Sequence, residues 1–108
     1  MSSHSTAPGL SQALAEFACT TGYDDIPEAV RERARIHMLD GLGIALASQA
    51  FPFAAPMLAA MDDLGAPGPA TIIGTARKTA PRDAALANGV LIHGLDFDDT
   101  HMEAILHP

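Results

Sequence analysis

The sequence predicts an all-α fold: a multihelical bundle with one short extended segment near residues 70–74. Alanine, the strongest helix former, accounts for 21 of the 108 residues. Apolar residues recur at helical spacing along most of the chain. Proline and acidic residues precede two of these apolar runs, as is typical of helix starts. Because aromatic residues make up only 5%, we expect a core of small side chains.

The N-terminal part begins with a polar stretch and continues into an amphipathic helix. Residues 1–8 are rich in Ser, Thr, His and Pro, so we expect a disordered N-terminus. The remainder, residues 9–108, is expected to form a partial helical domain. Leu10, Leu14 and Phe17 predict a first helix that stops near Gly22. Cys19 is interpreted as a small buried side chain, since no basic neighbour would activate it.

A second, longer helix is predicted from about Pro27 to Ser48. The segment 23–28 combines Asp, Pro and Glu, which suit the free amides and the dipole of a helix start. The second half, Met38 to Ala47, is apolar nearly all round, so we expect it to be buried. Asp40 in this half is interpreted as bonding to a neighbouring helix end, or alternatively as supporting the C-terminal cluster described below.

Two shorter features follow. A helix is predicted over Pro56–Leu64, after the break at Phe51-Pro52-Phe53. Residues 70–74 are too few for a helix and β-branched, so they are predicted to be extended. The basic pair Arg77 and Lys78 is interpreted as a solvated loop tip, with binding of an anionic substrate as the alternative.

A central helix is predicted over residues 81–95. Thr79 or Ala80 caps it, and Pro81 takes the first helical position. Because this helix is apolar on almost every face, we expect it to be surrounded by other elements. Asn88 needs a partner in that surface, either for a structural bond or in a functional site.

The C-terminal run, residues 93–108, holds three aspartates, one glutamate and three histidines. Such a dense group of titratable side chains at the end of an apolar scaffold is a candidate site for acid–base chemistry. A calcium loop starting at Asp96 would have His101 where Gly is needed and His107 where Glu is needed, so that reading is rejected. His93, Asp96 and His101 could form a two-histidine, one-carboxylate metal site.

Paired acid–base work fits this run better. Asp96 and Thr100 are four residues apart, which would place them on one face of a helical turn. His107 follows a short apolar segment and could fold back towards them. An imidazole is suited to moving a proton at carbon or oxygen near neutral pH.

Composition excludes several classes of function. Six Lys and Arg stand against 13 Asp and Glu, a formal net charge of −7, which argues against binding nucleic acid or an anionic membrane surface. A single cysteine excludes an internal disulfide. The apolar runs are shorter than the roughly 20 residues of a membrane span. We therefore expect a cytoplasmic protein that binds neither nucleic acid nor membrane.

The run from Ala84 to His101, followed by His107-Pro108, resembles the MmgE/PrpD family. This family includes 2-methylcitrate dehydratase, cis-aconitate decarboxylase and iminodisuccinate epimerase. The segment 26–43 resembles its second helix. The resemblance implies a large helical domain with a smaller α/β lid, a homodimer, and no cofactor or metal. It also implies catalytic roles for Asp96, Thr100 and His107, and His93 and Asp99 match its motif. We expect substrate-binding or supporting roles for His93, Asp99, His101 and Asn88.

Members of that family are several times longer and use further histidine, lysine and tyrosine residues. We therefore expect an N-terminal fragment or split subunit of a dehydratase-like lyase, acting on a small polycarboxylate such as 2-methylcitrate. A second chain or a homodimer would complete it, and the isolated chain would be catalytically silent and prone to associate. The alternative is an inactive helical dimerisation module. A lesser alternative is a metal-binding protein using His93, Asp96 and His101.

Overall fold

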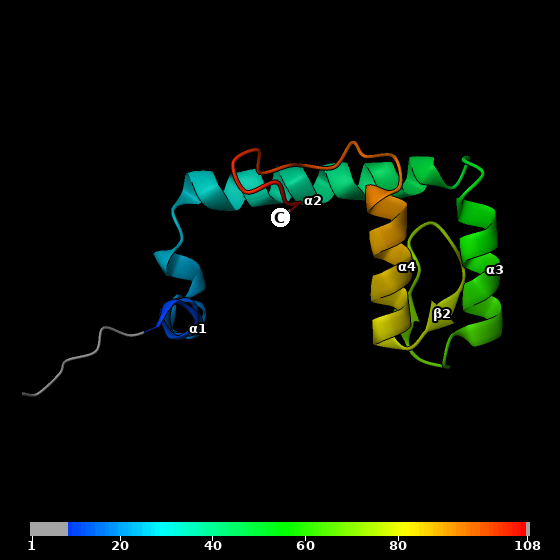
Figure 1. The fold of residues 1–108 in the computed structure, drawn as a ribbon, viewed down its shortest axis with the longest axis horizontal. Helices are drawn as coiled ribbons and strands as arrows, with labels where there is room; N and C mark the ends of the chain where they lie inside the picture. Colours follow the sequence, from blue (N-terminus) through cyan, green and yellow to red (C-terminus); the bar gives the residue numbers. More distant parts are fainter. Residues whose placement is uncertain (1–8, 108) are drawn as a thin grey trace, which may run out of the picture. The chain divides into compact units, whose positions relative to one another are not determined.

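The computed structural model describes residues 9–107, so the predicted disordered segment 1–8 and Pro108 lie outside the described residues. The helices are α1 (Leu10–Thr20), α2 (Glu28–Ser48), α3 (Ala54–Leu64) and α4 (Pro81–His93), with a 3-10 turn, η1 (Tyr23–Asp25). A two-stranded antiparallel sheet, β1 (Ala70–Thr71) and β2 (Lys78–Thr79), completes them (Figure 1). The mainly helical fold predicted from the sequence is confirmed. The chain divides into two compact units between Arg33 and Ala34.

The first unit contains α1, η1 and the start of α2. Arg31 stabilises the turn between them: its guanidinium contacts Glu28 at 2.6 Å and lies 4.5 Å from the centre of the Tyr23 ring. Helix α1 buries none of its residues. The expected burial of Cys19 is therefore wrong, and its side chain is exposed.

The core of the second unit lies where α3, α4 and the strand segment meet α2. As the composition indicates, most of its fully buried side chains are small, so the backbones can approach closely. Partly buried methionine, leucine and isoleucine side chains pack around them. The buried core consists of Ala45, Ala54, Ile72, Ala87 and Leu91.

The β-hairpin packs against α4 and lies beside α3, as Figure 1 shows. Ala70 pairs with Thr79 and Thr71 with Lys78, so the segment predicted as extended has a second strand as its partner. The loop-tip interpretation of the basic pair is confirmed only in part, because Lys78 is exposed but does not lie in a loop. Lys78 belongs to β2, and the Arg77 guanidinium makes two bonds of 2.8 Å to the carboxylate of Asp62 on α3.

The second half of α2 differs from its predicted environment. Only Ile44, Ala45 and Ser48 are buried in this helix, whereas Met38 is 65% exposed and Leu39 is 71% exposed. The expected burial of residues 38–47 is therefore wrong over most of that range, because the core covers only the side that carries Ala45.

The remaining boundaries are close to those predicted. Helix α3 begins at Ala54, two residues before the predicted start, and α4 ends at His93 rather than at 95. Its cap is Ala80 with proline in the first turn, as the sequence predicts. Among the described residues, no helix combines the length and apolar character needed to cross a membrane.

Candidate active site

The segment after α4 carries the candidate site and runs back along α2 (Figure 1). It is not helical, so the predicted helical turn through Asp96 and Thr100 is wrong. Asp96 has a φ of 55°, in the left-handed region that Asp tolerates better than most residues. Its N–H donates to the His93 carbonyl at 2.8 Å, which turns the chain at the end of α4.

A second turn returns the chain to the cluster. The N–H of His101 donates to Leu106 O at 2.8 Å, and Ile105 N–H donates to His101 O at 2.8 Å. These bonds bring His107 back beside Thr100 although seven residues separate them. His101 itself serves this turn, because its Nδ1 accepts the Ala104 N–H at 3.1 Å.

His107 lies close to several residues of the preceding loop. Its Nδ1 lies 3.2 Å from Asp98 Oδ2, 3.1 Å from the carbonyl oxygen of Asp99 and 3.4 Å from Thr100 Oγ1. On the other edge of the ring, Nε2 lies 3.9 Å from Asp96 Oδ1. The structure thus brings together Asp96, Thr100 and His107, the three residues predicted to be catalytic.

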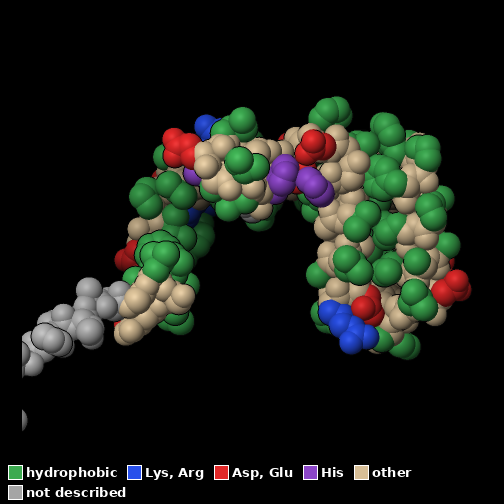
Figure 2. Space-filling model, viewed as in Figure 1, with side chains coloured by type: hydrophobic (Ala, Val, Ile, Leu, Met, Phe, Trp, Pro, Cys, Tyr) green, Lys and Arg blue, Asp and Glu red, His purple; other side chains and the backbone are tan. Residues whose placement is uncertain are grey.

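Asp98 is a central member of the cluster that the sequence interpretation left out. Its side chain is 8% exposed, against 84% for Asp96. The Nδ1 of His93 lies 3.2 Å and 3.3 Å from its two oxygens, and the His93 and His107 rings meet edge to face with centroids 4.5 Å apart. Figure 2 shows histidine side chains gathered beside acidic ones on this face.

The signal for Asp98 was present in the run Asp96-Phe97-Asp98-Asp99, but the sequence did not show which of these carboxylates would be turned inward. His37 was also missed. It lies on α2, and its Nδ1 is 3.2 Å from Asp99 Oδ2, which anchors the loop to the helix. A lone histidine in a helix carries no sequence signal for such a long-range partner.

Asn88 has a structural role outside this cluster. Its Oδ1 accepts the Ile73 N–H at 2.9 Å and its Nδ2 donates to the Thr71 carbonyl at 3.1 Å. The side chain therefore fastens the first strand and the residues after it to α4, and both of these contacts are to backbone groups.

Within the described part of the chain, four residues could hold a metal ion: His93, Asp96, Asp98 and His107 each offer a ligand atom, all within 4.8 Å of one another. Imidazole and carboxylate ligands suit zinc and similar divalent ions. This set shares His93 and Asp96 with the set proposed from the sequence, but has Asp98 and His107 in place of His101.

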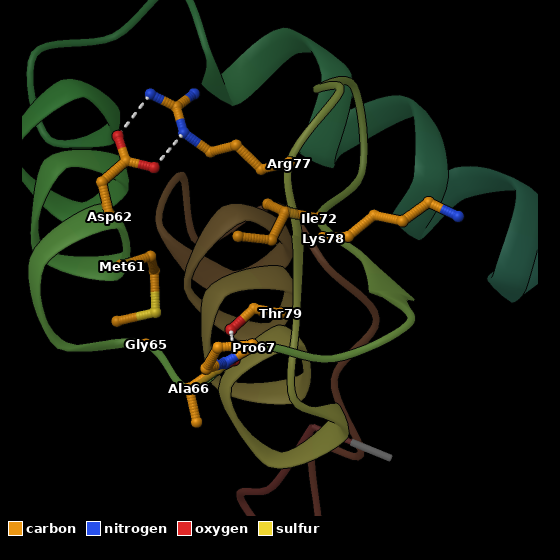
Figure 3. Close-up of a pocket in the computed structure, with 9 residues that line it drawn as sticks. All are labelled: Met61, Asp62, Gly65, Ala66, Pro67, Ile72, Arg77, Lys78 and Thr79. Carbon is orange, nitrogen blue, oxygen red and sulfur yellow. Dashed lines mark hydrogen bonds and ion pairs between the residues drawn. The ribbon is translucent and has the colours of Figure 1, made fainter.

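A separate pocket lies between the end of α3, the following loop and β2 (Figure 3). Of its two basic residues, Arg77 is already paired, because its guanidinium makes two hydrogen bonds to the Asp62 carboxylate. These bonds lower the pKa of Asp62. Figure 3 shows the Lys78 side chain directed away from the pocket and Thr79 bonded to Ala66. The pocket therefore gives little support to the binding of an anion by the basic pair.

An apolar groove adjoins the cluster. It is lined by side chains of α2 together with Leu95 and Phe97, the two neighbours of Asp96 in sequence. Asp40 also lines this groove and is exposed, in place of the helix-end contact considered from the sequence. Apolar walls beside acid–base groups are common in small-molecule sites.

Comparisons with known proteins agree on one family. Residues 12–108 match the model of the MmgE/PrpD N-terminal domain. The chain is 33% identical over 99 residues to a cis-aconitate decarboxylase of Aspergillus terreus, covering 92% of this chain and 20% of that protein. It is 36% identical over 83 residues to the cis-aconitate decarboxylase-like protein oryM of Aspergillus oryzae, covering 77% of this chain and 17% of that protein. The chain thus spans about a fifth of the length of these relatives. No solved structure matches it significantly.

Proposed function

This chain belongs to the MmgE/PrpD family, and from that premise we propose that it contributes the acid–base residues of a cofactor-independent lyase that acts on a small polycarboxylate. The observation that carries the proposal is the position of His107. Its ring lies against Thr100 and Asp98 on one edge and faces Asp96 on the other. A histidine held in this way is suited to transfer a proton at a carbon next to a carboxylate.

A dehydration begins with removal of that proton. His107 accepts it, and the electron pair remains on the carbon, where the adjacent carboxylate delocalises it. Departure of a neighbouring hydroxyl group as water, after protonation, would give a dehydratase. A decarboxylase, the activity for which the Aspergillus terreus relative is named, would start instead with loss of a carboxylate as carbon dioxide, which leaves the electron pair on the substrate, and protonated His107 would then donate a proton to the carbon. Asp96 and Thr100 would orient the substrate or the histidine.

A polycarboxylate also requires cationic partners, which this cluster supplies poorly. The ion pairs of Asp96, Asp98 and Asp99 are made with histidines, and the chain as a whole has a formal charge of −7. The chain also covers only about a fifth of the length of its relatives. We therefore propose that a partner, either a second copy of this chain or a different chain, supplies the cations that complete the site.

A chimera tests the proposal. Residues 12–108 of this chain would replace the matched segment of the Aspergillus terreus relative, and circular dichroism would first establish that the product folds. Release of carbon dioxide from cis-aconitate and dehydration of 2-methylcitrate would then be measured. We expect one of the two reactions, reduced by roughly 10²–10⁴-fold in a His107→Ala chimera. A folded chimera that is inactive on both acids would refute the proposal, as would one whose activity survives the loss of His107.

The exposed apolar groove favours one second candidate, a helical interaction module without activity of its own. Phe97 is 75% exposed and Leu39 is 71% exposed, although both border the groove. Exposed apolar surface of this kind commonly marks a contact with another protein. The chimera distinguishes the two candidates, because an interaction module would not sustain turnover.

A further inference from the structure

Asp98 is less exposed than the neighbouring carboxylates Asp96 and Asp99. Its side chain is 8% exposed, whereas that of Asp99 is 28% exposed and that of Asp96 is 84% exposed. It is also the carboxylate that two histidines share, with His93 Nδ1 and His107 Nδ1 each 3.2 Å from one of its oxygens. Such a buried charge is stabilised only when its neighbours donate hydrogen bonds to it.

The surroundings of His107 Nδ1 determine where its proton must be. Two of its neighbours, Asp98 Oδ2 at 3.2 Å and the Asp99 carbonyl oxygen at 3.1 Å, are acceptors when the carboxylate is ionised. The third, Thr100 Oγ1 at 3.4 Å, donates its own proton to the Asp98 carbonyl at 3.3 Å, so it too can accept at this contact. A nitrogen surrounded by acceptors must carry the hydrogen.

A neutral imidazole carries one ring proton, so a proton on Nδ1 leaves a free lone pair on Nε2. We propose that Asp98 is a positioning residue that holds His107 in its Nδ1–H tautomer and thereby presents Nε2 as the base. Nε2 is the nitrogen that faces Asp96, 3.9 Å away on the exposed side of the cluster. The role in catalysis rests on the proposed function, but the tautomer itself does not.

The same geometry assigns a role to His93. Its Nδ1 faces both oxygens of Asp98, at 3.2 Å and 3.3 Å, so it also donates to this carboxylate. Two histidine donors therefore hold Asp98 in place. When His107 accepts a substrate proton on Nε2, the resulting imidazolium remains bonded to a negative charge, which stabilises it.

Nuclear magnetic resonance of the intact chain labelled with 15N at histidine tests the tautomer. Long-range proton–nitrogen correlations distinguish a protonated from an unprotonated ring nitrogen. Spectra would be recorded after treatment with a chelator, at a pH roughly two units above ~6.5, the pKa of an unperturbed imidazole. We expect His107 with a protonated Nδ1 and an unprotonated Nε2. The opposite tautomer in the wild-type chain would overturn the proposal.

Two matched variants test the cause. Asp98→Asn removes the charge at nearly constant shape and should shift His107 towards a mixture of tautomers. Glu103→Gln is the control, because Glu103 is an exposed carboxylate in the same segment. The control should keep the wild-type tautomer. An Asp98→Asn chain with the wild-type tautomer would refute the assignment, since the Asp99 carbonyl would then suffice.

The chimera provides a readout that separates this inference from the proposed function. Asp98→Asn there should reduce kcat/KM by roughly 10²–10⁴-fold and change its pH profile, because the variant loses both the tautomer preference and the negative charge that stabilises the imidazolium. The Nδ1–H tautomer in a chain whose chimera never turns over would sink the proposed function and leave the role of Asp98 intact. Turnover by the chimera together with the opposite tautomer would refute the role of Asp98 and leave the proposed function intact.

Discussion

His37 Nδ1 lies 3.2 Å from Asp99 Oδ2 and joins the middle of α2 to the loop that carries the candidate site. The two residues are 62 positions apart (99 − 37), so the contact is set by the fold and not by local sequence. Asp99 at the same time offers its carbonyl oxygen to His107 at 3.1 Å. A change at His37 can therefore reach His107 through one residue.

Replacing His37 with Ala should loosen the loop without unfolding the second unit. Partly exposed pairs of this kind contribute about 0–1 kcal/mol, so the melting temperature should change little. Hydrogen exchange should become faster across residues 96–107, while α4 keeps its protection. Arg33→Ala, at an exposed position on the same helix, is the control. Unchanged exchange in the loop of the His37→Ala chain would show that the pair does not anchor it.

The two backbone bonds of Asn88 predict a cost in stability. Asn88→Ala leaves Ile73 N–H and the Thr71 carbonyl without this partner, which should lower the free energy of unfolding by about 1–2 kcal/mol. Urea denaturation measures the difference. Leu86→Ala on the same helix is the control, because that side chain is 60% exposed and should change stability by less than about 0.5 kcal/mol. Equal effects in the two variants would contradict the structural role of Asn88.

The helices were predictable because their signals are local. The proline of α4 and the apolar spacing of α1 act within a few residues of themselves, and both helices lie close to their predicted positions. The second strand was not predictable, because Lys78 and Thr79 become a strand only by pairing with Ala70 and Thr71. Pairing of this kind is a tertiary choice that a two-residue segment does not encode.

The candidate site shows the same division. The motif identified Asp96, Thr100 and His107 as a group, and the structure brings these side chains together. The helical turn expected between Asp96 and Thr100 is absent, because α4 ends at His93 and Asp96 then adopts a left-handed conformation that turns the chain. The inward position of Asp98 depends on that turn, so spacing alone could not have shown it.

Asp83 predicts how stability changes in acid. The Ala66 N–H donates to its carboxylate and, with a smaller contribution from Arg82, lowers its pKa below the ordinary 3.8. A group whose pKa is lowered in the folded state adds stability at a pH above its pKa in the unfolded state. This stability is lost as the pH falls through its pKa in the folded state. Asp62 acts in the same direction through Arg77.

The wild-type chain should therefore lose stability as the pH falls below about 3.8, the ordinary value for these carboxyls. Asp83→Asn keeps an oxygen that can accept from Ala66 but cannot titrate, so its unfolding free energy should fall less over the same range. Urea unfolding at neutral pH and at about pH 3 measures both chains. An equal loss in the variant would show that Asp83 does not contribute to the acid dependence.

The apolar groove beside the site predicts that the purified chain associates with itself. Leu39 and Phe97 both line it and are 71% and 75% exposed, and covering such surface contributes about 25 cal/mol per Å² before the costs of association. Leu39→Gln with Phe97→Gln should lower the sedimentation coefficient at high concentration while circular dichroism stays unchanged, because neither side chain belongs to the buried core. Leu64→Gln is the matched control, since Leu64 is 81% exposed but lies outside the groove. A chain that sediments as a monomer at every concentration, or a control that dissociates it equally well, would contradict a role for this groove.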